Sequence, residues 1–214
     1  MAATPEQLRR IRGLGTAEDS PSRQLARATV DVARTYFLPG EFAPFLVARP
    51  DRYLRGGDHL SFNAEGFAAV RMTEWREDFN HQHQNVRVEN GVQFGDLLQF
   101  VDFSYVARVA KLNAATLATL AASPGIPVDV KIVTTRLENG TTLTWKAPEG
   151  APAGLYYELL WRETTAPDWQ YMQAVPAAAG VDPVTLTVPI SKDNVIFGVR
   201  AVDAAGHRGL AATP

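Results

Sequence analysis

The chain has 214 residues, of which 46% are hydrophobic and 21% charged, and this composition excludes wholesale disorder, collagen-like repeats and a coiled coil. Its formal net charge of −2 argues against a protein that neutralises nucleic-acid phosphates or sits on anionic lipid, and no apolar run reaches the roughly 20 residues of a membrane span. The absence of cysteine excludes disulfides, thiolate catalysis and Cys-ligated zinc.

The first predicted element is an amphipathic helix. Ser20 followed by Pro21 is typical of an N-cap and a first helical position. Apolar residues then recur at helical spacing until Pro39-Gly40 ends the pattern. The residues that define this face are Leu25, Ala28, Thr29, Val32, Ala33 and Tyr36.

Two predicted strands and a second long helix follow. Residues 42–48 and 68–72 are short apolar runs bounded by loop residues, a pattern that predicts strands. Asp102 is placed to cap the second helix. Helices and strands in this alternation indicate an α/β layer fold. The residues of the second helix that share one face are Val106, Val109, Ala110, Asn113, Leu117 and Leu120.

The pattern changes at residues 123–127, where two prolines and a glycine predict a linker. After it come short β-rich runs, separated by turn signals such as Asn139-Gly140, and this spacing predicts an antiparallel sandwich. Three aromatic residues that alternate with strand period are expected in its core: Trp145, Tyr157 and Trp161. The predicted strands cover residues 128–134, 141–145, 156–162, 169–173, 184–188 and 195–202.

Three of the four histidines, His59, His81 and His83, lie within 25 residues of one another. Neutral imidazole is the commonest protein metal ligand, and a carboxylate partner fixes its tautomer. No strict zinc motif such as H-E-x-x-H is present, so the residue types alone predict either a metal site or a solvated polar loop. The carboxylates of the same stretch are Asp58, Glu65, Glu74, Glu77 and Asp78.

Four segments carry a resemblance to a known family: DSPSRQLAR (19–27), DRYLRGGDHLSF (51–62), EGFAAVRMTE (65–74) and HQHQNVRVENGVQFGDLLQFVDFSYVARV (81–109). Together they cover most of residues 19–121. They closely resemble the C-terminal part of bacterial zinc aminopeptidases of metallopeptidase family twenty-eight, relatives of glutamate carboxypeptidase and glutaminyl cyclase. The later segments TLTW, YYELLWR and FGVRAVDAAGHRG resemble a fibronectin type III domain, which some members of the family carry after the catalytic domain.

The resemblance implies a fold class of two parts, a partial α/β zinc-exopeptidase domain of the phosphorylase/hydrolase-like layer type and an all-β fibronectin type III sandwich. The corresponding boundaries are residues 1–123 for the C-terminal portion of the zinc-peptidase domain, 124–127 for the linker and 128–214 for the sandwich.

The resemblance also implies roles for four residues. The family binds two zinc ions per complete domain, and its last zinc ligand is a histidine in an H-x-x-x-D pattern, which here runs from His81 to Asn85. His81 is the implied ligand and His83 the substitute, while Asn85 replaces the usual supporting aspartate. Asp58, in a D-H-x-x-F loop, is implied as an acid behind the metal, with a loop-fixing carboxylate as the alternative.

The family's H-x-D motif and adjacent Glu-Glu pair, which supply further ligands and the catalytic base, occur nowhere in this sequence. One histidine cannot hold two zinc ions, because each takes about four ligands. We therefore expect at most a partial zinc site, no catalytic base in this chain and no activity of the chain alone. Met1 would then be an internal start in a longer or broken reading frame.

The whole enzyme is expected to remove N-terminal residues from peptides, and the resemblance implies a periplasmic or secreted location. Two alternatives remain open. The first is a non-catalytic binding module or degenerate pseudo-peptidase that meets a partner or a surface through the fibronectin-like domain. The second keeps the fold but catalyses glutaminyl cyclisation. Neither alternative involves nucleic acid or a membrane span.

Overall fold

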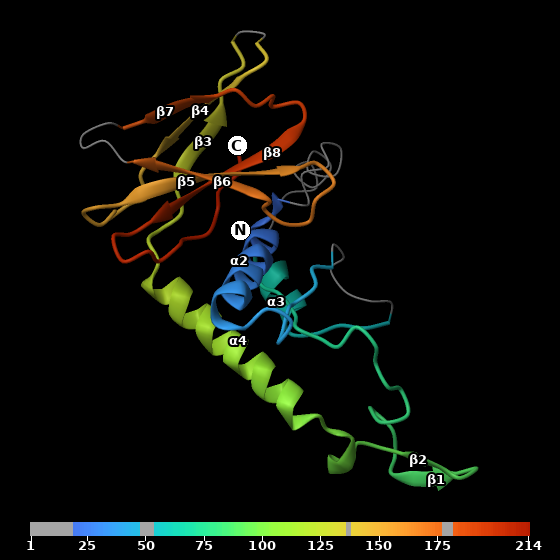
Figure 1. Cartoon of the computed structure of the whole chain (residues 1–214). Helices are drawn as coiled ribbons and strands as arrows, with labels where there is room; N and C mark the ends of the chain where they lie inside the picture. The colour runs from blue at the N-terminus through green and yellow to red at the C-terminus, as the bar shows by residue number, and fades with distance from the viewer. Residues whose placement is uncertain (1–18, 48–53, 136–137, 177–181) are drawn as a thin grey trace.

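The computed structural model describes residues 19–47, 54–135, 138–176 and 182–214 (Figure 1). Figure 1 shows the later strands gathered in one body with α2 beneath them, and α4 running away from that body toward the β1–β2 hairpin. The elements in chain order are α2 (Pro21–Tyr36), α3 (His59–Ala64), β1 (Arg87–Glu89), β2 (Val92–Phe94), the 3-10 turn η2 (Leu98–Phe100), α4 (Phe103–Ala122), β3 (Val128–Ile132), β4 (Thr141–Lys146), β5 (Tyr156–Glu163), β6 (Tyr171–Pro176), β7 (Val184–Val188) and β8 (Val195–Val202).

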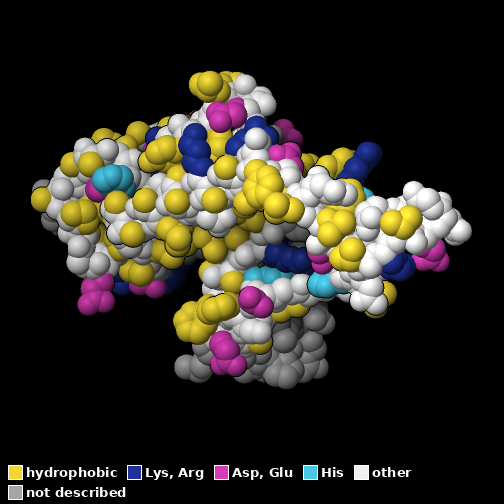
Figure 2. All heavy atoms as spheres, turned by 90° about the horizontal axis from the view of Figure 1, so that it is seen from below, with side chains coloured by type: hydrophobic (Ala, Val, Ile, Leu, Met, Phe, Trp, Pro, Cys, Tyr) yellow, Lys and Arg dark blue, Asp and Glu magenta, His cyan; other side chains and the backbone are white. Residues whose placement is uncertain are grey.

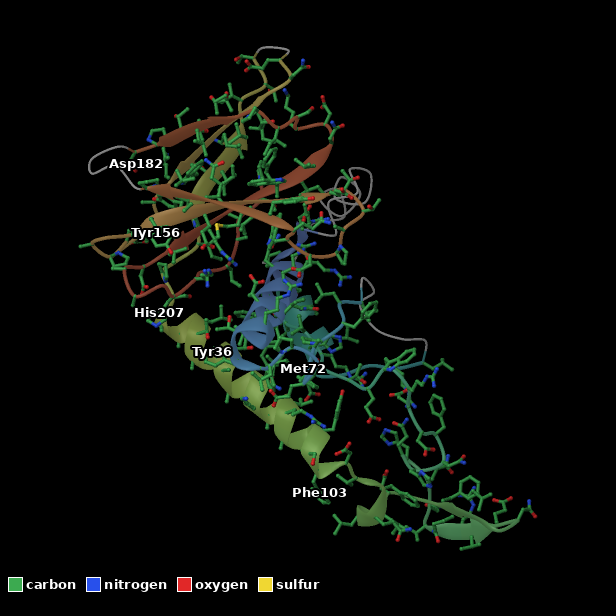
Figure 3. The ribbon with its side chains drawn as sticks, in the orientation of Figure 1. Tyr36, Met72, Phe103, Tyr156, Asp182 and His207 are labelled. Atoms are coloured by element: carbon green, nitrogen blue, oxygen red, sulfur yellow. The ribbon has the colours of Figure 1, made fainter. Side chains whose placement is uncertain are left out.

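Helix α2 begins and ends close to where the sequence predicts. The Ser20 hydroxyl accepts a hydrogen bond from the Arg23 amide at 3.3 Å, and Pro21 is the first helical residue. The helix packs against α4 through a small apolar cluster, and Met72, labelled in Figure 3, packs against that cluster. Its buried members are Val32, Ala33, Phe37 and Leu112.

Helix α4 is also confirmed, with its cap as expected. The Asp102 carboxylate accepts a hydrogen bond from the Tyr105 amide at 2.9 Å. The predicted common face, however, is not the face that packs. Leu112 and Thr116 are the buried residues of the helix, whereas Val106 and Leu117 are exposed. The reason is that α2 covers the opposite side of α4, around Leu112.

The two strands predicted in the first half of the chain do not form. Residues 42–47 and 68–72 are irregular, and residue 48 lies outside the described residues. An apolar run becomes a strand only when a neighbour supplies hydrogen-bond partners. The described strands offer these two runs no partner and pair only antiparallel, so they form no parallel layer of an α/β domain.

A hairpin that is not among the predicted elements occupies part of this region. Strands β1 and β2 pair antiparallel across a turn at Asn90-Gly91, where both residues have positive φ values of 51° and 79°. Asn-Gly is the strongest short-range hairpin signal, because both residues tolerate positive φ. The Asn90-Gly91 pair is therefore a sequence signal for this hairpin, of the same kind as the Asn139-Gly140 turn signal.

The predicted antiparallel sandwich is confirmed as two facing three-stranded sheets, β3-β4-β7 and β6-β5-β8. The fourth predicted strand, residues 169–173, is displaced and becomes β6 at Tyr171–Pro176. Trp145 and Tyr157 lie in the shared core as expected, with ring centroids 5.5 Å apart in an edge-to-face arrangement. Trp161 is partly buried against this core.

The outer face of sheet β6-β5-β8 is covered along β5, whereas most of β6 is exposed. Arg27 of α2 and Arg162 of β5 are 2% and 1% exposed, and both contact Asp19, at 3.4 and 2.8 Å. Both guanidinium groups also lie near the ring of Trp169, 5.4 and 5.8 Å from its centroid. This indole sits over Gly198, where a Cβ would lie only 2.7 Å from ring atoms. The glycine in the middle of β8 therefore makes room for the covering layer.

The connection between α4 and β3 is packed against the sandwich. A Cβ on Gly209 would lie 2.7 Å from the Pro124 carbonyl oxygen, and one on Gly125 would lie 2.9 Å from the Pro148 side chain. The predicted linker at residues 124–127 is thus an ordered crossing. Within the described residues, no helix is both long enough and apolar enough to cross a bilayer.

Candidate functional site

His81 lies on a turn that Asp78 organises. One carboxylate oxygen of Asp78 accepts a hydrogen bond from the Asn80 amide at 3.0 Å, and the His81 amide donates to the Asp78 carbonyl at 3.1 Å. The turn is tied to the hairpin by a bond from the Gly95 amide to the Asn80 carbonyl at 2.9 Å. Side-chain capping of this kind is typical of aspartate in turns, and it fixes the approach of the histidine ring.

The imidazole of His81 is held on three sides. Its Nδ1 lies 2.6 Å from the second carboxylate oxygen of Asp78, and its Nε2 lies 3.1 Å from the Gln93 carbonyl oxygen. The ring stacks on Phe100 with centroids 3.5 Å apart and planes 18° apart. The hydrogen bond from His81 holds the pKa of the Asp78 carboxyl below its ordinary value of 3.8, and the bond from the Asn80 amide acts in the same direction.

His81 opens onto a cavity of about 480 Å³. The cavity is rich in carboxylates, because Glu74, Glu77 and Asp96 line it together with Asp78, whereas Arg71 is the basic residue of its wall. Glu77 is paired with Arg55 at 3.2 Å and Asp78 with His81, but acidic side chains still outnumber basic ones in the wall, and such a lining favours a cationic group or a metal ion. The remaining lining residues are Thr73, Gln82, Leu97, Leu98, Phe100 and Val101.

The other sequence-predicted site residues do not join His81. His83 is exposed with a φ of 53°, and its amide donates to the Asp96 carboxylate at 3.3 Å. Asn85 is exposed, and its backbone carbonyl accepts from Arg87 at 3.3 Å. Asp58 is exposed at the start of α3, makes no side-chain cap bond and does not line the cavity. Of the two predicted roles for Asp58, the structure shows neither.

The partner that the structure gives His81 is Asp78, three residues earlier. In the sequence, Asp78 is one of the carboxylates near the histidines and has no predicted role. A matching pair exists elsewhere, because His207 Nδ1 lies 2.7 Å from an Asp203 carboxylate oxygen in a loop of the sandwich. A histidine–aspartate contact alone is therefore not a mark of a metal site, and what distinguishes His81 is the acidic cavity beside it.

The described residues do not make up a zinc site. Among them, no group of three or more His, Cys, Asp or Glu side chains is placed to hold a metal ion. Zinc takes about four ligands, and with Nδ1 on Asp78 the nitrogen left for a metal is Nε2, which here faces the Gln93 carbonyl. The geometry of the described residues therefore provides one oriented imidazole ligand and not the further ligands that zinc needs.

No protein-family model matches the chain. Similar proteins do exist among fungi, and each of the three described here carries the name "probable zinc metalloprotease". One from Leptosphaeria maculans is 45% identical over 201 residues, which is 94% of this chain and 45% of the relative. One from Pyricularia oryzae is 46% identical over 205 residues, covering 94% and 39%, and one from Pyrenophora tritici-repentis is 43% identical over 201 residues, covering 94% and 40%.

Nearly the whole chain thus resembles proteins named as zinc metalloproteases, but the chain spans less than half of their length. The relatives carry additional polypeptide outside the part that this chain matches.

Proposed function

We propose that this chain forms part of a zinc peptidase that removes N-terminal residues from peptides, in which His81 is one zinc ligand. The observation that carries the proposal is the His81–Asp78 pair at the edge of an acidic cavity. A carboxylate that holds one imidazole nitrogen orients the ring and leaves the other nitrogen for a metal. The similarity to proteins named as zinc metalloproteases supports the same assignment.

The chain's own residues have two tasks in this proposal. Asp78 orients His81, and the carboxylates of the cavity attract the positively charged α-ammonium group of a peptide N-terminus. Zinc, when bound, polarises a peptide carbonyl. Because one imidazole cannot hold the metal, the remaining ligands and the base come from outside the described residues, and the chain by itself is inactive.

The finer family assignment follows the resemblance. We assign residues 1–123 to the C-terminal portion of a domain of metallopeptidase family twenty-eight, residues 124–127 to the linker and residues 128–214 to a fibronectin type III domain. The strand orders β3-β4-β7 and β6-β5-β8 support the last assignment. A periplasmic or secreted location belongs to the same proposal.

One observation favours a second function, a degenerate pseudo-peptidase that binds without catalysis. The described residues contain no metal-holding group, and Asn85 stands exposed where the family carries a supporting aspartate. In that case no zinc binds His81 even when the rest of the domain is supplied. The same experiment therefore decides between the two functions.

The experiment joins this chain to the part of the Leptosphaeria maculans relative that it does not match, and compares this fusion with the chain alone. We expect the fusion to retain stoichiometric zinc after dialysis and to release amino acids from peptides with a free N-terminus but not from N-acetylated peptides. We expect the chain alone to do neither. A fusion that folds but binds no zinc supports the pseudo-peptidase instead.

Matched histidine variants locate the ligand. In the fusion, His81→Ala should lower zinc affinity by about a hundredfold or more, and Asp78→Ala by about 10–100-fold, because the carboxylate only orients the ligand. His207→Ala removes the equivalent pair of the sandwich and should leave zinc affinity unchanged. Equal zinc contents in the His81 and His207 variants would refute the assignment.

A further inference from the structure

Helix α4 has two apolar faces, and the described residues cover one of them. Around Leu112 and Thr116 it packs toward α2. On the opposite side runs a row of residues at helical spacing, all apolar and all exposed, which we name the outer stripe. The outer stripe consists of Phe103, Val106, Ala107, Ala110, Ala114, Leu117, Ala118 and Ala121.

The exposure of the outer stripe is large. Phe103, Val106 and Leu117 are 60%, 52% and 71% exposed, and the charged side chains of α4, Arg108 and Lys111, lie outside the stripe. A helix that is apolar on both faces is normally buried inside a larger fold. Figure 3 labels Phe103 at the end of α4 away from the sandwich, so the uncovered row extends along the whole helix.

The other segments that precede the sandwich also expose large hydrophobic side chains. Among the described residues, the large hydrophobic side chains that are exposed lie between Tyr36 and Val128, with the exceptions of Tyr171 and Met172. Figure 2, which views the molecule from below, shows hydrophobic side chains spread across its surface. Contiguous apolar surface on a water-exposed protein marks an interaction site.

The lengths of the relatives indicate what covers this surface. Almost all of this chain, 94%, aligns with proteins of which it spans 39–45%, so those proteins contain more than an equal length of further polypeptide. A second copy of the chain, paired through α4, would leave exposed apolar side chains of other segments, such as Phe45, Phe67 and Trp75, uncovered. A larger partner is required to cover them as well.

We propose that the outer stripe of α4 docks a folded polypeptide layer with a matching apolar face, supplied by the part of the relatives that this chain does not match. The alanines at Ala110, Ala114 and Ala121 let the backbone of that layer approach closely, and the larger side chains at Phe103 and Leu117 insert beside it. This inference concerns packing alone and does not depend on zinc binding by His81.

The absence of cysteine from the chain allows a direct test. Leu117→Cys introduces a single thiol in the outer stripe, and Met172→Cys, at a site 50% exposed on β6, provides the control. Each variant is labelled with a maleimide in three forms: the chain alone, the chain co-produced with the unmatched part of the Leptosphaeria maculans relative, and the single-chain fusion. Mass spectrometry of this chain's peptides reports the labelling rate.

We expect the co-produced polypeptides to purify together, and labelling at position 117 to slow by at least about tenfold in the complex and in the fusion while labelling at position 172 is unchanged. Leu117→Glu should abolish co-purification, whereas Met172→Glu should not. The proposal is overturned by equal labelling at position 117 in the chain alone and in the fusion. It is also overturned if position 117 is already protected from the maleimide in the chain alone because the chain forms a dimer. Protection of position 117 that occurs only when lipid vesicles are added would likewise overturn it. Repeating the labelling with a chelator separates this result from zinc binding.

Discussion

Asp78 uses its two carboxylate oxygens for two contacts, one to the Asn80 amide and one to the ring of His81. The first contact fixes the carboxylate on the turn, so the second can fix the ring. Both contacts depend on how the turn positions Asp78, Asn80 and His81, and the order of these residues in the sequence does not specify that geometry. The sequence pattern therefore predicts His81 as a ligand, but the supporting residues that it predicts are Asn85 and Asp58 and not Asp78.

The pKa of Asp78 gives a prediction at this scale. The hydrogen bond from His81 lowers this pKa below 3.8, so the contact stabilises the folded state above pH 3.8 and its contribution is lost as the pH falls through the lower, folded-state value. His81→Ala should raise the pKa of Asp78 toward 3.8. Carboxyl-carbon NMR titration measures this shift. Asp129, whose pKa is lowered by a hydrogen bond from Lys146, is the internal control and should not move. An unchanged Asp78 titration contradicts the contact.

At the scale of elements, α2 joins the two halves of the molecule through charged side chains. Arg27 donates to the Pro167 carbonyl at 2.9 Å, and Arg200 donates to Asp31 of α2 at 2.6 Å and to Glu158 at 2.6 Å. Arginine side chains usually remain solvated, so helical periodicity assigned the apolar residues of α2 to its buried face and left Arg27 out. The Pro167 carbonyl that accepts from Arg27 lies 140 residues away in the chain, which a local pattern cannot include.

The shared carboxylate of Asp19 yields the next prediction. Asp19→Ala leaves Arg27 and Arg162 buried without their common anion, and this should lower the free energy of unfolding by about 3–5 kcal/mol. Urea unfolding followed by Trp fluorescence measures the loss. Lys146→Met breaks the exposed pair with Asp129 and should cause little change. If both variants unfold at the same urea concentration, the buried network does not join α2 to the sandwich.

The predicted strands succeed or fail according to where their partners lie. The sandwich supplies a paired strand to each of the predicted segments 184–188 and 195–202, which hydrogen-bond to β4 and β5, and both segments form strands with the predicted bounds. Residues 42–47 and 68–72 have the same local character but no described partner, and they remain irregular. Strand propensity describes how a side chain fits a sheet, and the sheet itself must come from elsewhere.

For the whole molecule, apolar side chains are distributed unequally. The sandwich has a closed core in which Leu143, Trp145 and Val199 are 0% exposed, whereas the apolar core beside it consists of a few residues of α2 and α4. Composition averages over both parts, so it excludes wholesale disorder without showing that one half holds most of the core. Because the part before the sandwich has so small a core, one apolar face of α4, the outer stripe, is left exposed.

This asymmetry predicts a gradient of amide hydrogen exchange in the chain alone. Amides of β5, which is paired on both sides and packed in the core, should exchange on the order of a thousandfold more slowly than those of the β1–β2 hairpin, whose strands are short and largely exposed. Helix α4 should lie between them, because one of its faces is covered by α2. Exchange read by mass spectrometry at peptide level resolves the three segments. Equal protection in α4 and β5 would mean that the outer stripe is already covered in the chain alone, and slow exchange in the hairpin would mean that it packs against more of the molecule than its exposed strands indicate.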